Sequence, residues 1–102
     1  MIVHVAAFRW LDSVTADDAA EALEGIRAIA GEVAGVIDIS CGTSYSPYSR
    51  GLTHAILVRA ESQEALDAYR AHPNHLAAGS KMDLSQDVDE NNQPGIVVDF
   101  VA

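Results

Sequence analysis

Apolar and polar positions alternate along short stretches of the chain, which is the pattern of half-buried β-strands. The stretches are IVHVAAFRW at 2–10, GVIDISCG at 35–42, THAILVRA at 53–60 and IVVDFVA at 96–102. Because alternate side chains of a strand share a face, each stretch presents one set of residues together. These sets are His4, Ala6, Phe8 and Trp10 in the first stretch, Ile37, Ile39 and Cys41 in the second, and His54, Ile56 and Val58 in the third.

A first helix is predicted between the first two strands. Thr15 can cap it through its hydroxyl, and Asp17 and Asp18 follow in the first turn, where negative charge is favourable. Gly31 and Gly35 offer its end. The apolar stripe at helical spacing consists of Ala19, Leu23, Ile26, Ala30 and Val33.

A second helix follows the third strand. Ser62 can cap it, and Ala65, Leu66 and Tyr69 are its apolar residues. Pro73 disfavours helical geometry at His72 and can begin a further helical turn. We therefore expect this helix to break just before its end.

The order strand, helix, strand, strand, helix, strand predicts an α+β fold of the ferredoxin-like split βαβ type. Such a fold has a four-stranded antiparallel sheet with both helices on one face, and residues 1–102 form one domain of ordinary size. We expect the first and third strands to be central, parallel neighbours. His4 and His54, both early in their strands, would then stand side by side.

The sheet face without helices is expected to be apolar. Val3, Val5, Val98 and Phe100 are the candidates to occupy it. An uncovered apolar face needs a partner, and a second copy of the chain related by a two-fold axis meets that need. The prediction is a homodimer in which sheet packs on sheet.

Charge narrows the range of partners and locations. The 102 residues include 15 acidic and 6 basic side chains, for a net charge of −9, and such a field repels nucleic acid and anionic membrane surfaces. Apolar runs fall far short of the roughly 20 residues that span a bilayer. The start of the chain lacks the basic segment of a signal peptide. The single Cys41 is typical of the reducing cytoplasm.

The stretch YRAHPNHLAA at 69–78 is the main candidate for chemistry. In an apolar cavity His75 would stay neutral and could accept a proton next to a carbonyl, while Tyr69 could donate a hydrogen bond to the developing oxyanion. The structural alternative is a polar helix end with Tyr69 packed in the core.

The strand histidines have two interpretations as well. If their face meets the helices, His4 and His54 line the same cavity together with Ala6, Phe8 and Ile56. The alternative is that they are buried and bonded to each other or to Tyr45, Tyr48 or a backbone group, since buried polar groups find partners.

Metal and calcium sites are not expected. His72 and His75 lack a third and fourth ligand, because Cys41 is distant in sequence. The acidic loop offers Asp87, Asp89 and Asn91 in a calcium-like order but has Asn92 and Val98 where that motif needs glycine and glutamate. As a free thiol in a strand, Cys41 is a poor candidate nucleophile.

From end to end the chain resembles the stress-responsive dimeric α/β-barrel (Dabb) family. The similarity rests on the opening strand with its histidine, on GLTHAILVRAESQEALDAYRAHPNHLA and on the closing VVDFVA. The resemblance implies a ferredoxin-like monomer that dimerises into a barrel, with diverse activities. One kind is a plant cyclase that folds a linear polyketide by aldol chemistry, without metal or organic cofactor.

Carried over by motif position, the roles of the cyclase tyrosine and final histidine fall on Tyr69 and His75. His4 and His54 correspond to histidines of its first and third strands, and His72 lies within the same motif. The implied ligand is a small apolar or phenolic molecule, and no cofactor is implied. Small residues distinguish this chain from the cyclase and put the substrate in doubt; they are Ala6, Ala20, Ala77 and Ala78.

Other functions remain open at this point. One is a non-catalytic, stress-related dimer that binds a small molecule or only assembles. Another is a monooxygenase-like relative, because similar dimeric barrels oxidise aromatic polyketides or bind haem.

Overall fold

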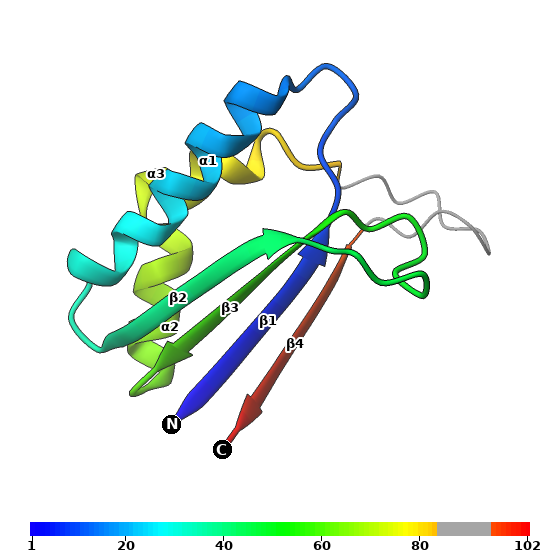
Figure 1. Ribbon diagram of the computed structural model, residues 1–102. Helices are drawn as coiled ribbons and strands as arrows, with labels where there is room; N and C mark the ends of the chain where they lie inside the picture. The colour runs from blue at the N-terminus through cyan, green and yellow to red at the C-terminus, as the bar shows by residue number, and fades with distance from the viewer. Residues whose placement is uncertain (84–94) are drawn as a thin grey trace.

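The computed structural model describes residues 1–83 and 95–102, in which four strands form one antiparallel sheet in the order β2-β3-β1-β4. The strands are β1 (Ile2–Phe8), β2 (Val36–Thr43), β3 (His54–Ala60) and β4 (Ile96–Val101). The helices are α1 (Ala16–Ala28), the short 3-10 helix η1 (Ile29–Gly31), α2 (Gln63–Ala71) and α3 (Pro73–Gly79). The helices lie on one side of the sheet (Figure 1). The predicted ferredoxin-like fold class is therefore confirmed.

Strand β1 runs antiparallel to β3, so the expectation of parallel neighbours was wrong. Helix α1 returns the chain so that β2 runs in the direction of β1, and the loop after β2 reverses it before β3 inserts between them. His4 therefore faces Val58, whereas His54 faces Phe8 at the far end of the strand pair. The two histidines share a face of the sheet but lie at opposite ends of it.

A register shift near the start of β2 changes which side chains meet the core. Val36 pairs with Ala60 and is buried, whereas Asp38 pairs with Arg59, so that Ile37 occupies the irregularity and is exposed. Ile39 and Cys41 pack against the core as predicted. The expectation that Ile37 shares their side was wrong, because an extra residue in one strand displaces the alternation.

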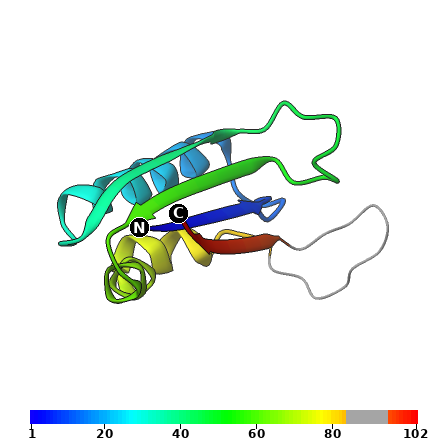
Figure 2. The same ribbon diagram turned by 90° about the horizontal axis from the view of Figure 1, so that it is seen from below.

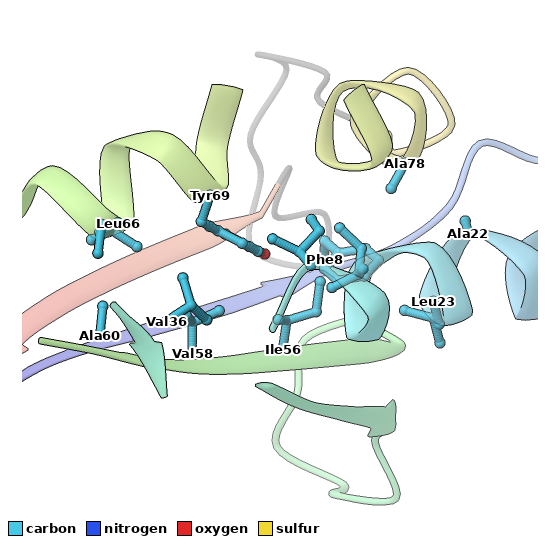
Figure 3. Packing of buried hydrophobic residues seen from close by; sticks show 13 residues of the cluster. Phe8, Ala22, Leu23, Val36, Ile56, Val58, Ala60, Leu66, Tyr69 and Ala78 are labelled. Carbon is cyan, nitrogen blue, oxygen red and sulfur yellow. The ribbon is translucent and has the colours of Figure 1, made fainter. Parts of the chain in front are cut away.

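The predicted caps begin the helices. The Thr15 hydroxyl accepts from the backbone N–H of Asp18, and the Ser62 hydroxyl accepts from that of Ala65. Figure 3 shows Tyr69 pointing from α2 into the layer between helices and sheet. The core in that layer consists of Phe8, Ala22, Leu23, Ile26, Ile29, Val36, Ile56, Val58, Ala60, Ala65, Leu66, Tyr69 and Ala78.

The sheet face away from the helices, hereafter the open face, is apolar along β1 and β4. Val5 pairs with Val98, and Val3 pairs with Phe100. Val98 and Phe100 are 52% and 50% exposed. Val3 is buried, in contrast to the expectation of a fully bare face, because Phe100 and Arg59 flank it in the sheet. The predicted apolar face is thus present, with part of it already covered.

The two termini lie side by side at one end of the sheet, and the loop between β2 and β3 projects beyond the other end (Figure 2). The backbone N–H of Ala102 donates to the carbonyl of Met1 at 2.9 Å, which closes the terminal end. Across the part of the chain that the structure describes, none of the helices has the length and apolar character of a membrane span.

Candidate functional site

The break between α2 and α3 brings Tyr69 and His75 together. His72 adopts an extended conformation, with φ −63° and ψ 139°, and Pro73 begins the next helix as predicted. On an uninterrupted helix, residues six apart would point roughly 120° away from each other around the axis. Because the chain changes direction at His72, the rings of Tyr69 and His75 instead meet edge to face with their centroids 4.9 Å apart.

Tyr69 and His75 are both held in their neutral forms by burial. Burial raises the pKa of Tyr69 far above its ordinary value. Burial also lowers the pKa of His75, and the charges of His4 and Arg70 act in the same direction, while a backbone contact with Arg70 opposes them. Nδ1 of His75 is buried and has no hydrogen-bond partner among the described residues. An unpartnered buried nitrogen is costly, so this atom needs an explanation beyond packing.

His4 lies on the other side of Tyr69 and is bound to an acidic residue of β4. Its ring meets that of Tyr69 edge to face at 5.8 Å, and its Nδ1 is 2.6 Å from Oδ1 of Asp99. Arg70 donates to the second carboxylate oxygen of Asp99 at 2.6 Å. Burial alone would raise the pKa of Asp99, but the hydrogen bonds from His4 and Arg70 together outweigh that effect and lower it.

His54 belongs to a second cluster, at the other end of β1. Its ring stacks on Phe8 at 5.9 Å, and Nε1–H of Trp10 is directed at its Nε2 over 3.5 Å. Its Nδ1 is 2.8 Å from the Thr53 hydroxyl. Burial lowers the pKa of His54. Neither histidine bonds to Tyr45 or Tyr48, which are almost fully exposed.

His72 has a structural position. Its Nδ1 accepts from the backbone N–H of Asn74 at 3.0 Å and so caps α3. Since Nδ1 is an acceptor there, the proton lies on Nε2, which donates to Glu32 at 2.5 Å. Both nitrogens of His72 are therefore occupied, and its ring anchors α3 rather than facing Tyr69.

The structure thus groups the predicted residues into two clusters. His4, Tyr69 and His75 come together, and Phe8 and His54 lie apart from them. Ala6 and Ile56 pair across β1 and β3 on the sheet face between the two clusters. Asp99 and Arg70 were missed in the sequence, although an acidic residue amid the apolar residues of IVVDFVA was a usable signal.

Metal ligands do not gather in the part of the chain described here: residues 1–83 and 95–102 contain no group of three or more His, Cys, Asp or Glu side chains able to hold an ion. The calcium-like positions Asp87, Asp89 and Asn91 lie outside the described residues. Cys41 is a free thiol whose pKa is raised by burial, which disfavours the reactive thiolate.

Hollows in the surface lie away from Tyr69. One, of about 740 Å³, lies between β2, β3 and the loop that joins them, and it includes Tyr45 and Leu57. Another, of about 350 Å³, reaches His54 from the same loop. Tyr69 and His4 are only 1% and 3% exposed, so His75, which is half-buried, is the most accessible of the three rings.

The comparisons with known proteins agree with this fold. A solved structure of the Arabidopsis thaliana protein At3g17210 has 21% sequence identity and a TM-score of 0.76, covering 100% of this chain and 95% of its own. A dimeric ferredoxin-like protein of unknown function from Jannaschia sp. CCS1 has 23% identity and a TM-score of 0.76, covering 99% and 98%. The hydroxynitrile lyase of Passiflora edulis has 12% identity and a TM-score of 0.73, covering 99% and 92%.

At sequence identities this low, the structural similarities establish the fold alone. No curated protein matches the sequence significantly. The model of the stress responsive A/B barrel domain, however, matches residues 2–101. That match spans nearly the whole chain, including both histidine clusters and all four strands, and the chain therefore belongs to the stress responsive A/B barrel domain family.

Proposed function

We propose that this protein is a homodimer that transfers protons on a small apolar or phenolic molecule without a cofactor, in the manner of a polyketide cyclase. His75 is the base and Tyr69 is the hydrogen-bond donor. The observation that carries the proposal is the buried Nδ1 of His75, which has no partner among the described residues and belongs to a ring packed on Tyr69. A native site tolerates such an atom where a ligand or a reaction uses it.

The proposed chemistry follows from the states of the two rings. A neutral imidazole with a lowered pKa accepts a proton from a carbon next to a carbonyl group. The carbonyl oxygen gains negative charge, and the Tyr69 hydroxyl donates a hydrogen bond to it. Because burial raises the pKa of Tyr69, that hydroxyl keeps its proton and stabilises the charge without being consumed. The resulting enolate can attack a second carbonyl, as in an aldol cyclisation, or be reprotonated elsewhere, as in an isomerisation.

A two-fold dimer would cover the open face. The apolar residues of β1 and β4 there remain substantially exposed in one chain, and Leu57 of β3 continues the surface. The Jannaschia relative is a dimeric protein. Replacing Val98 by Asp would place charge in the interface, so we expect the variant to sediment as a monomer while the wild type sediments as a dimer. A wild-type monomer at micromolar concentration would contradict this arrangement.

We further propose a cytoplasmic location, since Cys41 is an unpaired thiol.

The direct test of the catalytic proposal compares His75→Gln and Tyr69→Phe with the matched control His54→Gln. The probes are phenolic ligands and linear polyketide mimics, and both their binding and the formation of product are measured. We expect His75→Gln to reduce turnover by about a hundredfold or more, in the range of a lost general base, and His54→Gln to retain most of it. Equal losses in both histidine variants, in step with lost stability, would contradict the proposal.

A second function is favoured by the burial of the site. Tyr69 and His4 are almost completely covered, as in a protein whose aromatic cluster serves packing. In that case the protein would be a stress-related dimer that binds a small molecule or only assembles. Binding of the probes without any product, unchanged by His75→Gln, would establish this alternative.

A further inference from the structure

Asp99 lies between two basic side chains from different parts of the fold. It faces His4 across the β1–β4 pair, and each of its carboxylate oxygens is 2.6 Å from a nitrogen, Oδ1 from Nδ1 of His4 and Oδ2 from a guanidinium nitrogen of Arg70. The same guanidinium nitrogen is 3.4 Å from Nδ1 of His4. Asp99, His4 and Arg70 thus form a triangle of one carboxylate, one imidazole and one guanidinium at β4, an edge strand of the sheet.

This triangle fixes the tautomer of His4. A carboxylate accepts hydrogen bonds and cannot donate them, so Nδ1 of His4 carries a proton and donates it to Asp99. Nδ1 therefore has no lone pair available to Arg70. In the neutral ring the lone pair is left on Nε2, and protonation there gives an imidazolium whose charge Asp99 stabilises.

His4 and His75 flank the same phenol with opposite surroundings. His4 has a carboxylate partner, whereas Nδ1 of His75 has none among the described residues. Their rings meet that of Tyr69 at 5.8 and 4.9 Å. Two imidazoles beside one phenol, one with a carboxylate partner and one without, are the arrangement expected of an acid and a base.

We propose that His4 is the acid that works opposite His75 across Tyr69, and that Asp99 and Arg70 are the positioning residues that fix the tautomer and the orientation of its ring. The proposal rests on the proton-transfer function above. In an aldol step, His75 takes the proton from the carbon next to the carbonyl, the new carbon–carbon bond forms, and His4 gives its proton to the alkoxide oxygen. The proton then held by His75 returns to His4 through solvent, so protons balance over one turnover.

Asp99 and Arg70 act on His4 in opposite directions. The negative charge of Asp99 stabilises the imidazolium of His4. The positive charge of Arg70 repels that imidazolium and also neutralises part of the charge of Asp99. Removing Asp99 therefore frees the tautomer of His4, whereas removing Arg70 leaves the hydrogen bond from His4 to Asp99 in place. A purely structural ion pair would lower stability in both variants without this difference.

The charge of His4 also reaches His75. The groups that face the two rings are Asp99 of β4, Arg70 and Tyr69 of α2, and each histidine itself. Cys41 of β2 influences Tyr69. Because a cationic His4 lowers the pKa of His75, a change made at Asp99 is expected to appear at His75, on the far side of Tyr69.

The test is a titration of the ring nitrogens of all histidines by nitrogen NMR in the intact protein. In the wild type we expect the neutral ring of His4 to carry its proton on Nδ1, next to Asp99. In Asp99→Asn this tautomer should no longer be fixed, because an amide can donate to Nδ1 as well as accept from it, and the His75 midpoint should rise. In Arg70→Gln the Nδ1 proton of His4 should stay in place.

Matched controls come from the exposed pair on the open face, where Arg59 donates to Asp38. Asp38→Asn and Arg59→Gln remove the same kinds of charge away from the histidines and should leave the His4 tautomer and the His75 midpoint in place. His4→Gln is a second route to the same readout, since it should raise the His75 midpoint even if Asp99→Asn fails to fold. A wild-type His4 that carries its proton on Nε2, or a His75 midpoint that ignores both Asp99→Asn and His4→Gln, would overturn the proposal.

This readout is separate from activity. If no probe turns over, the proposed function fails, and the acid role of His4 fails with it. If His75→Gln abolishes turnover but the His75 midpoint ignores the changes at Asp99 and His4, the pairing fails alone.

Discussion

Gly35 offers a stringent test of how the helical layer is fixed to the sheet. It lies between η1 and β2 with φ +88°, and its carbonyl accepts from the backbone N–H of Glu61 at 2.8 Å. A Cβ at this position would lie 2.8 Å from Cβ of Ala65 in α2. The substitution Gly35→Ala therefore combines an unfavourable backbone conformation with a collision between two atoms that have no flexible side chain to move.

The expected cost is the sum of these two effects. A left-handed conformation costs a residue with a Cβ roughly 1–2 kcal/mol. Overpacking of a filled site costs about 1–3 kcal/mol. Together they predict a loss of roughly 2–5 kcal/mol, which is a large share of the ~5–15 kcal/mol of a typical domain. For a chain of this size the melting temperature would fall by about 10 °C or more.

Urea unfolding followed by circular dichroism measures this loss directly. The matched control is Gly31→Ala, because a Cβ there has nothing within 4 Å and its φ is not positive. We expect the control to change the unfolding free energy by less than about 1 kcal/mol, in the range of glycine-to-alanine changes at compatible positions. A Gly35→Ala variant as stable as the wild type, or a control that loses as much, would refute the reasoning.

Three further outcomes can be measured by the same unfolding assay. The paired Asp99 has a lowered pKa in the folded state. The stability that its ion pairs with His4 and Arg70 contribute is therefore present above its ordinary pKa and is lost as the pH falls through the folded value, so the advantage of wild type over Asp99→Asn should shrink in acid below about pH 4. A stability advantage that does not depend on pH would exclude this linkage. Leu66→Ala empties a fully buried site of α2 and should cost about 2–5 kcal/mol, a loss that a value below 1 kcal/mol would contradict. Asn74→Ala removes a 2.9 Å hydrogen bond from the Asn74 side chain in α3 to the backbone carbonyl of Gly25 in α1. This variant should lose about 1 kcal/mol of unfolding free energy, with no change in the secondary structure seen by circular dichroism.

Local signals predicted the elements of this fold well. Thr15, Ser62 and Pro73 act within a few residues of themselves, through caps and a fixed backbone angle, and each begins a helix where the sequence indicated. The strands followed from alternation for the same reason. Ile37 shows the limit of that signal, because the register shift in β2 depends on pairing with β3 rather than on β2 alone.

The candidate site could be predicted only in part, because its contacts join distant segments. Tyr69 and His75 are close in sequence, and the proline between them was a readable sign of a change in direction. The contact of His4 with Asp99 spans 95 positions, and it depends on the register between the first and last strands, which no local pattern specifies. The assumed parallel pairing of β1 and β3 likewise misplaced His54, because strand direction is a property of the whole topology.

The change of direction at His72 and Pro73 has a consequence for how this protein can evolve. Three core residues lie in α2 before the break, whereas α3 carries His75 and one core residue, Ala78, after it. Substitutions in α3 can therefore reshape the surroundings of Tyr69 while the sheet and α2 stay intact. The exposed positions among these seven residues can thus vary while the rest of the scaffold is left as it is.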